Sequence, residues 1–266
     1  MQGYYENHRD DMTNAHAWYA RDNRFAPHFH NSVELAYVLE GEIIATLDGV
    51  ERRVGPRGMV ISSSYVVHSY ETPEASHIVV AIIPMTEVPS VRQLLSKQAF
   101  ASPVCEDDER HTLGSLMELL AACGYGGHIT RKGLCYTLLG MLIDRVGLVE
   151  ARPNSRTAFI REVLDYLQQH HTDPLSVESV AAQFGYSRSR FSYLFHAHLG
   201  YTLMDYVAAV RCRHAAQLLR ETDMPVSGVA MSVGFESLRT FHRAFKKQYD
   251  MTPHRYARAG FDENTG

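Results

Sequence analysis

Four residues in the first third of the chain have side chains that bind divalent metal ions in many proteins. His28 and His30 are two positions apart, Glu34 follows four positions later, and His68 lies further along. Residues at positions i and i+2 of a β-strand point to the same side, so both imidazoles would face one way, and Glu34 would share that side if the chain stays extended. Imidazole nitrogens with a carboxylate oxygen suit Zn²⁺, Ni²⁺, Mn²⁺ or Fe²⁺.

The elements that must position these residues are predicted to be short strands. Within residues 14–84, apolar runs such as 33–39 and 43–47 are separated by turn-forming pairs such as Asp48-Gly49. The stretch 76–84 has the continuous apolar character of a buried strand. Many short strands at near-regular spacing predict a small antiparallel barrel or a double-sheet jelly roll.

The spacing from His28 to Gly41 resembles the first cupin motif, H-x-H-x₃-E-x₆-G, residue for residue. The stretch 58–68 is similar to the second cupin motif, although it is one residue shorter and lacks the usual proline and glycine, which leaves the placement of His68 open. The resemblance implies either a metal site or, as in regulators that carry this domain, the polar lining of an effector pocket.

Aromatic residues near these positions could stack on a sugar ring or another small molecule, or they could be ordinary barrel core. The predicted effector pocket therefore consists of Phe25, His28, His30, Glu34, Tyr37, His68 and Tyr70.

A second feature is one short pattern that occurs twice, in residues 176–195 and 227–245. Each copy has a small residue, a glycine four positions later, and two phenylalanines at i and i+4 of a following amphipathic stretch. These are Ala181, Gly185, Phe191 and Phe195 in the first copy and Ala230, Gly234, Phe241 and Phe245 in the second. A single copy also fits a plain helical hairpin, but two copies indicate two helix-turn-helix units that read DNA.

Between the copies, residues 203–220 form one continuous amphipathic stretch. A helix of that length spans roughly 27 Å, close to the ~34 Å that separates successive major-groove faces. The two parts of the chain also differ in net charge. Residues 1–155 carry 13 lysines and arginines against 19 acidic residues, whereas residues 156–260 carry 13 against 9. The basic part coincides with the predicted DNA-binding part, as phosphate contacts require.

Residues 155–258 resemble the AraC/XylS family of bacterial transcription regulators, with Asp250 in a position where that family usually has glycine. Outward positions of the first recognition helix are Arg188, Ser189, Ser192, Tyr193 and His196, of which the resemblance places Ser189, Ser192 and Tyr193 against bases. Those of the second are Leu238, Arg239, His242, Arg243 and Lys246. Arg239 and Arg243 are expected to pair with guanines, and Lys246, Lys247 and Arg255 with phosphates.

The segment 91–150 is predicted to be a helical element, with helices near 113–123 and 129–146. By resemblance it would form a homodimer interface, although it would also cap the barrel. The acidic run 106–109 suits the start of a helix and needs no partner. Residues 151–156, with proline, asparagine and serine, are the predicted linker.

Together these patterns predict an α+β protein of two domains. Residues 1–90 would be the cupin-like jelly roll, followed by the helical pair, the linker and an all-α domain at 157–260 with two helix-turn-helix motifs joined by a long helix. The expected function is a transcription regulator, activator more often than repressor, that binds double-stranded promoter DNA. A small effector, such as a carbohydrate, would control it, or the metal itself. RNA polymerase would be a partner of an activator.

Other features of the chain bear on its location and activity. Four cysteines without a C-x-x-C pair, no leader and no long apolar run favour a cytoplasmic protein with no membrane partner. A cupin enzyme tethered to DNA is the remaining alternative, and we expect no enzyme.

Overall fold

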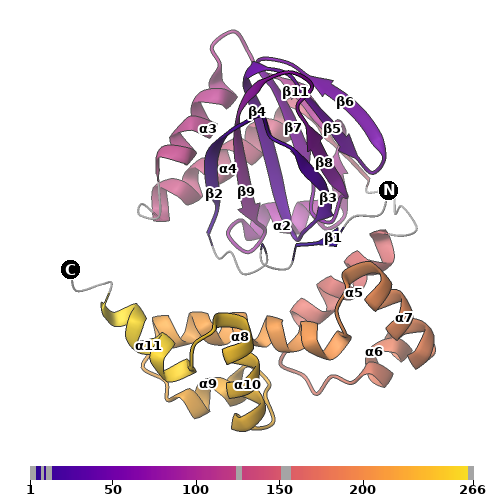
Figure 1. Cartoon of the computed structure of the whole chain (residues 1–266), viewed down its shortest axis with the longest axis vertical. Helices are drawn as coiled ribbons and strands as arrows, with labels where there is room; N and C mark the ends of the chain where they lie inside the picture. The colour runs from indigo at the N-terminus through magenta and orange to yellow at the C-terminus, as the bar shows by residue number, and fades with distance from the viewer. Residues whose placement is uncertain (1–3, 7–8, 10–13, 124–127, 151–156, 263–266) are drawn as a thin grey trace. The chain divides into compact units, whose positions relative to one another are not determined.

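The computed structural model describes residues 4–6, 9, 14–123, 128–150 and 157–262. The chain divides into an N-terminal unit, Met1–Thr157, and a C-terminal unit, Ala158–Gly266. In the described part, the first unit is built from strands followed by helices, and the second from helices alone (Figure 1). The predicted α+β class is confirmed. The predicted linker at 151–156 lies outside the described residues.

The N-terminal unit is a sandwich of two five-stranded sheets. The first has the order β1 (Tyr4–Tyr5), β3 (Phe25–Phe29), β8 (His68–Glu71), β5 (Ile43–Leu47) and β6 (Val50–Val54). The second has the order β11 (Val104–Glu106), β7 (Gly58–Ser62), β4 (Ser32–Gly41), β9 (Ser76–Pro84) and β2 (His16–Arg21). Among the described strands of these sheets, every pairing is antiparallel except that of β1 with β3, so the unit is a double-sheet jelly roll as expected.

The β5–β6 hairpin shows how local sequence sets register. Leu47 pairs with Val50, which leaves Asp48 and Gly49 as the two turn residues. Both have positive φ, 47° and 83°. A two-residue hairpin loop of this kind requires positive φ at both positions, which Asp-Gly tolerates best.

Strand β4 is buried on both faces. Ala36 and Val38 belong to the apolar cluster between the two sheets. Leu35 and Tyr37 belong to a second cluster, which the sheet forms with α3 (Thr112–Ala122) and α4 (His128–Val146). Figure 1 shows these two helices beside the sheet that contains β2, β9 and β4. Because both faces are covered, this strand reads as a continuous apolar run.

The segment predicted as a helical element, 91–150, also contains strands. Helix α2 (Pro89–Leu95) lies at its start, and β10 (Gln98–Phe100) pairs with β12 (Leu148–Glu150). Strand β11 adds to the edge of the second sheet beside β7. Three-residue strands are too short to show a period of two, which is why the sequence pattern missed them. Among the described helices, none is both long and apolar enough to cross a membrane.

The C-terminal unit contains two helix-turn-helix motifs. After α5 (Thr157–Gln169), the first motif is α6 (Val177–Gln183) and α7 (Arg188–Leu199). The long α8 (Leu203–Glu221) leads to the second motif, α9 (Val226–Ser232) and α10 (Leu238–Tyr249), and α11 (Pro253–Asp262) closes the unit. The paired phenylalanines of α7 and α10 are all fully buried. They form the apolar stripe that the repeat predicted.

Four of these helices have a serine or threonine as the N-cap residue. Ser176, Ser187, Thr202 and Ser237 each accept a hydrogen bond from the backbone N–H three positions later. Each bond satisfies a donor that the first turn of a helix leaves unpaired. The turn glycines Gly185 and Gly234 have φ of 72° and 92°, and Asp250 ends α10 at φ 52°. Asp250 thus takes the left-handed conformation expected of the glycine it replaces.

Candidate metal centre and nucleic-acid interface

His28, His30, Glu34 and His68 meet at one place in the jelly roll, and we call them the His/Glu centre. One ligand atom from each lies within 4.8 Å of the others, and all four residues are buried. His28 comes from β3 and pairs with His68 at the start of β8, Glu34 comes from β4, and His30 lies between β3 and β4. The register fixes His68 opposite His28, which the irregular second motif had left open.

Backbone carbonyls orient two of the imidazoles. The Nδ1 of His28 lies 2.9 Å from the Ala26 carbonyl oxygen, and the Nδ1 of His68 lies 2.8 Å from that of Val66. Each Nδ1–H therefore donates to a carbonyl, which leaves Nε2 of the neutral ring as the lone-pair nitrogen. This arrangement is typical of metal-binding histidines, whose second nitrogen is held by a hydrogen bond.

His30 is held differently. Its Nε2 lies 3.2 Å from Glu34 Oε2, while the Ser32 N–H donates to its Nδ1 at 3.3 Å. In this state the Nε2–H donates to the carboxylate. A metal ion bound at Nε2 would require the proton to leave that nitrogen, which is the ordinary competition between protons and metals for a ligand.

The electrostatics of the centre favour a cation. Burial and the neighbouring His68 lower the pKa of His28 to about 4, so its ring is neutral near pH 7. Burial alone would raise the pKa of Glu34, but contacts with His30 and His68 hold that pKa well below its usual range. Burial opposes protonation of His68, yet the Glu34 carboxylate raises the pKa of His68 above its ordinary value. The centre thus pairs a buried carboxylate with a proton that a metal ion could replace.

The residues present fit a first-row divalent ion. The Nε2 of His68 is buried without a hydrogen-bond partner among the described residues. Two ligand atoms that each lie ~2.1 Å from one metal ion are about 3.0 to 4.2 Å apart. The Glu34 Oε2 distances of 3.2 Å to His30 Nε2 and 3.7 Å to His68 Nε2 fall in that range.

Of the aromatic residues predicted for the pocket, two lie at the centre and one does not. The Phe25 ring is 4.8 Å from that of His28, and Tyr70 is 5.8 Å from His68 and hydrogen-bonds Ser62 at 3.2 Å. Tyr37 packs instead against the helices on the outer face of β4. It is three residues from Glu34, and an odd separation places two strand residues on opposite faces. Tyr37 is therefore corrected to a position outside the pocket.

The predicted DNA-contacting positions of the first recognition helix, α7, all lie on its exposed side. Arg188, Ser189, Ser192, Tyr193 and His196 are solvent-exposed. Arg188 pairs with Glu178 at 2.7 Å, and both side chains are mostly exposed. An exposed pair of this kind contributes little and would give way to a phosphate. The guanidinium of Arg190, which the sequence did not single out, lies 5.8 Å from the Tyr193 ring centre.

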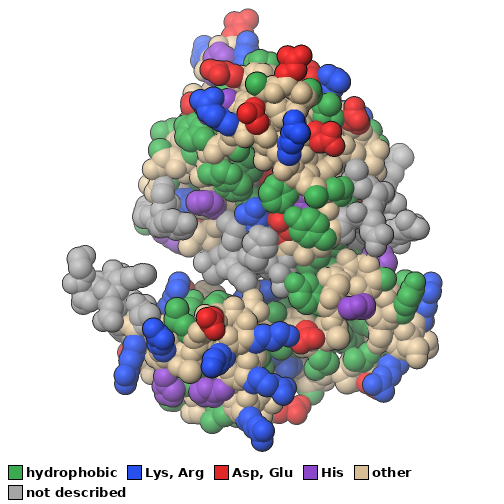
Figure 2. Space-filling model, in the orientation of Figure 1, with side chains coloured by type: hydrophobic (Ala, Val, Ile, Leu, Met, Phe, Trp, Pro, Cys, Tyr) green, Lys and Arg blue, Asp and Glu red, His purple; other side chains and the backbone are tan. Residues whose placement is uncertain are grey.

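The second recognition helix, α10, presents a more basic exposed side. Arg239, Arg243, Lys246 and Lys247 are exposed, and His242 is half-buried beside the Phe241 ring. Lys247 Nζ contacts Asp205 of α8 at 3.2 Å. On the face shown in Figure 2, the C-terminal unit displays more basic than acidic side chains. Both recognition helices thus offer polar and basic groups to a partner.

Comparison with known proteins identifies a domain in each of the two units. A helix-turn-helix domain model matches residues 180–259, and a cupin domain model matches residues 19–83. The multiple antibiotic resistance protein MarA of Escherichia coli (strain K12) is 33% identical over 106 residues, which are 40% of this chain and 84% of MarA. The chain belongs to the AraC/XylS family of transcription regulators. It is a DNA-binding regulator with a cupin domain.

Other relatives and solved structures are similar over very different shares of the chain. The transcriptional regulator Rob of Salmonella typhimurium is 38% identical over 104 residues, and the chain spans only 36% of its length. Among solved structures, the C-terminal domain of AraT from Geobacillus stearothermophilus is 29% identical, with 41% of this chain and 88% of that one covered and a TM-score of 0.37. ToxT from Vibrio cholerae is 10% identical, with 92% and 98% covered and a TM-score of 0.43.

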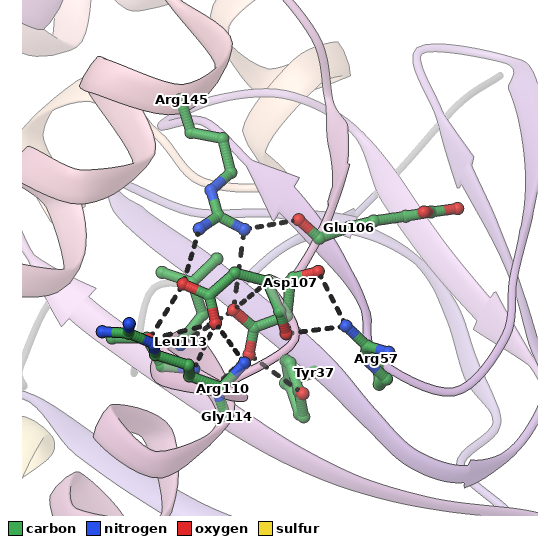
Figure 3. A network of polar contacts seen from close by, with 10 residues as sticks. Tyr37, Arg57, Glu106, Asp107, Arg110, Leu113, Gly114 and Arg145 are labelled. Atoms are coloured by element: carbon green, nitrogen blue, oxygen red, sulfur yellow. Dashed lines mark hydrogen bonds and ion pairs between the residues drawn. The ribbon is translucent and has the colours of Figure 1, made fainter.

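A network of polar contacts on the outer side of the jelly roll was not predicted (Figure 3). The buried Asp107 carboxylate accepts hydrogen bonds from the Leu113 and Gly114 N–H groups at 3.1 and 2.9 Å. It also accepts one from the Tyr37 hydroxyl at 3.1 Å. Burial and this carboxylate raise the pKa of Tyr37 to about 12. The acidic run at 106–109 therefore has specific partners, contrary to our expectation.

Two arginines complete this network. Arg57 donates to the backbone carbonyls of Asp107 and Asp108 at 3.3 and 2.7 Å. Arg145, near the end of α4, lies 3.6 Å from the Asp107 carboxylate and donates to the Glu106 carbonyl. The Asp107 carboxylate thus joins β4 to the start of α3 and the end of α4. The backbone carbonyls of Asp107 and Asp108 hold the loop before β7 through Arg57.

Proposed function

We propose that this regulator binds a divalent transition-metal ion at the His/Glu centre and that occupancy of the centre changes its binding to promoter DNA. One observation carries the proposal: four buried donors from separate strand segments converge, and the Nε2 of His68 has no hydrogen-bond partner among the described residues. Burial of such groups without a ligand costs free energy. A bound ion would supply a fixed double positive charge that offsets this cost.

The protein's own residues define what the ion would meet. Glu34 would contribute the negative charge, and His28 and His68 would present Nε2 because Ala26 and Val66 hold their other nitrogen. His30 would give up its proton on Nε2 before it binds. Imidazoles with one carboxylate fit Zn²⁺, Ni²⁺, Mn²⁺ or Fe²⁺.

An organic effector such as a carbohydrate is less well supported. Stacking on a sugar requires open aromatic faces, but Tyr70 is 1% exposed and Tyr37 faces away from the centre. The space between the sheets is occupied by buried apolar side chains such as Ile43 and Ile78. Phe25 is the half-buried aromatic residue that remains beside His28. An organic ligand that chelates the metal would agree with both the predicted metal site and the predicted organic effector.

For DNA, we propose that α7 and α10 enter successive major grooves on one side of the duplex. Helix α8, which joins the two motifs, has 19 residues, so it spans about 28 Å, near the ~34 Å between such grooves. The short or neutral residues of α7, Ser189 and Ser192, make modest base contacts, while Arg239 and Arg243 read guanines and the lysines of α10 bind phosphates.

Elemental analysis tests the metal proposal directly. Untagged protein purified without chelators is expected to carry about one metal ion per chain, and a His28→Ala/His30→Ala double variant none. Fluorescence anisotropy with promoter DNA should then differ between metal-loaded and chelator-treated wild-type protein but not for the variant. The proposal would be wrong if the wild-type protein were purified without metal and also failed to bind added metal. Sugars would then be screened as ligands. Turnover of a ligand would favour an enzyme instead.

The remaining partners stay predictions. A homodimer through α3 and α4 is motivated by exposed apolar residues on both helices, Leu119 and Ile129, which are 55% and 87% exposed. Sedimentation of the full chain measures its oligomeric state. Contact with RNA polymerase follows only if the protein activates transcription.

A further inference from the structure

Each helix-turn-helix motif packs on its own half of α8. Near the start of that helix, the Tyr206 ring centre lies 6.0 Å from that of Phe195 in the first motif. Further along, Cys212 and Leu219 belong to the apolar cluster of the second motif. Long helices are rarely straight, so α8 alone would fix the relative orientation of the two motifs only loosely. A contact that bridges the motifs would fix it more closely.

Arg211 lies at the boundary between these two halves of α8 and is 8% exposed. Its Nε donates to the His171 carbonyl oxygen at 2.6 Å, and its Nη2 donates to the Asp173 carbonyl oxygen at 2.7 Å. Both carbonyls belong to residues 170–176, which join α5 to α6 and which we call the α5–α6 loop. Hydrogen bonds from an ionised group that is shielded from water are among the stronger ones.

The α5–α6 loop also meets the turn of the second motif. A Cβ at Gly234 would lie 2.8 Å from the Thr172 carbonyl oxygen and 3.0 Å from that of His171, so the two backbones are in close contact. The guanidinium carbon of Arg211 lies 5.9 Å from the ring centre of Phe235, the next residue of that turn. Arg211 thus contacts the loop that leads into one motif and the turn of the other.

The rival explanation is that Arg211 only supports the α5–α6 loop. That loop has a second contact with α8, because the His214 ring stacks on that of His171 with 4.0 Å between the ring centres. What Arg211 adds is a planar guanidinium, which reaches two carbonyls at once and also lies over Phe235. A loop support and a bridge between motifs predict different responses to the geometry of the DNA.

We propose that Arg211 is a positioning residue for DNA recognition, which holds the α5–α6 loop against the turn of the second motif and so sets the spacing of DNA segments that the protein accepts. Because the side chain is buried against backbone carbonyls, it acts through the two recognition helices and not by contact with DNA. The inference rests on the proposed placement of α7 and α10 in successive major grooves, since spacing matters only when both motifs bind at once.

The test measures how DNA binding depends on the spacing of the two recognised segments. A duplex selected in vitro by the wild-type full chain is compared, by fluorescence anisotropy, with the same duplex carrying one or two extra base pairs between the segments. Each base pair moves the segments apart by ~3.4 Å and rotates them by roughly 35° about the duplex axis. Wild-type protein should lose about tenfold or more in affinity, because only one motif then stays in register.

Two variants separate the bridge from the charge. Arg211→Met keeps an apolar stem and removes both donors, and its loss on the lengthened duplexes should shrink to about threefold or less, because the motifs can then take up other orientations. Arg220→Met is the matched control. It removes the same charge from the same helix, but Arg220 is exposed and lies 4.6 Å from the Tyr256 ring centre of α11. This variant should keep the wild-type dependence on spacing.

Duplexes that carry only one of the two recognised segments show whether each motif still folds. At low salt, both variants should bind each single segment as tightly as wild-type protein does.

Four outcomes overturn the inference. A loss as large as that of wild-type protein in Arg211→Met would do so while the two-groove placement stands. An equally reduced loss in both variants would assign the effect to charge. Weaker binding of Arg211→Met to single segments would assign Arg211 to the folding of the unit alone. Wild-type protein that tolerates the extra base pairs would remove the two-groove placement together with this inference.

Discussion

Asp107 provides the helix cap that α3 lacks. The N-cap residue of α3, His111, is in the left-handed region at φ 54° and makes no side-chain capping bond. Asp107 lies upstream and accepts from the Leu113 and Gly114 N–H groups instead. Removal of a buried carboxylate that accepts several hydrogen bonds leaves those donors unpaired. Its removal should therefore matter more than that of the exposed Glu109.

Asp107→Asn should lower the free energy of unfolding by about 3 kcal/mol, because the amide NH₂ would face backbone donors and leave buried groups unpaired. Chemical denaturation of the full chain measures this. Glu109→Gln, in the same acidic run but exposed, should change stability by less than about 0.5 kcal/mol. Similar effects of the two substitutions would contradict a capping role for Asp107.

Arg243 and Lys247, both exposed on α10, should respond differently when replaced by alanine. Arg243→Ala should cost about 1–3 kcal/mol of binding and relax the preference at one base position. Lys247→Ala should weaken binding to all sequences alike and reduce the salt slope by about 1. Anisotropy titrations on single-base variants of a selected site, at several salt concentrations, separate the two. A uniform loss for Arg243→Ala would assign it to a phosphate.

At the scale of the helix-turn-helix element, the two turn glycines have unequal surroundings. A Cβ at Gly234 would lie 2.8 Å from the Thr172 carbonyl oxygen, whereas one at Gly185 would meet nothing within 4 Å. Both have positive φ, so alanine costs roughly 1 kcal/mol of backbone strain at either site. Only at Gly234 must neighbouring backbone also move.

Gly234→Ala should therefore destabilise the C-terminal unit clearly more than Gly185→Ala, by at least about 1 kcal/mol. Thermal unfolding followed by circular dichroism at 222 nm provides the comparison, with DNA affinity as a check on the fold. If Gly185→Ala proved as damaging, the close approach to Thr172 would not be the cause.

Helix α8 contains a histidine whose protonation opposes folding. The His214 ring stacks on that of His171 with 4.0 Å between the ring centres. Burial, with His171 and Arg213 nearby, lowers the pKa of His214 from 6.5 to about 4. The unfolded chain therefore takes up this proton first.

The contribution of neutral His214 to the free energy of unfolding should be complete above pH 6.5 and should decline as the pH falls toward 4. The loss should be on the order of 2 kcal/mol, since the ring is partly exposed. Denaturation of wild-type protein and His214→Gln from pH 7.5 to 4.5 measures it. The variant should show the shallower decline, and parallel curves would rule out this role for His214.

At the scale of the whole molecule, most of the correct predictions came from the repeated helix-turn-helix pattern and from the alternation of residues along strands. The spacing of His28, His30 and Glu34 located the centre, and the duplicated phenylalanine pairs located both recognition helices. Tyr37 was misplaced because proximity in sequence was weighed above strand parity. Arg211 and Asp107 gave no periodic signal, since each has partners that lie far along the chain. Contacts of that kind are set by tertiary structure.

Strand β4 carries residues of two sites on its opposite faces. Glu34 is on its inner face at the His/Glu centre, and Tyr37 is on its outer face, bonded to the carboxylate that begins α3. Backbone ladders to β7 and β9 hold both sides of the strand between them. The strand is therefore a direct backbone connection between Glu34 and the helical layer. Strand β4 thus connects the Glu34 carboxylate on its inner face with the Tyr37 phenol on its outer face.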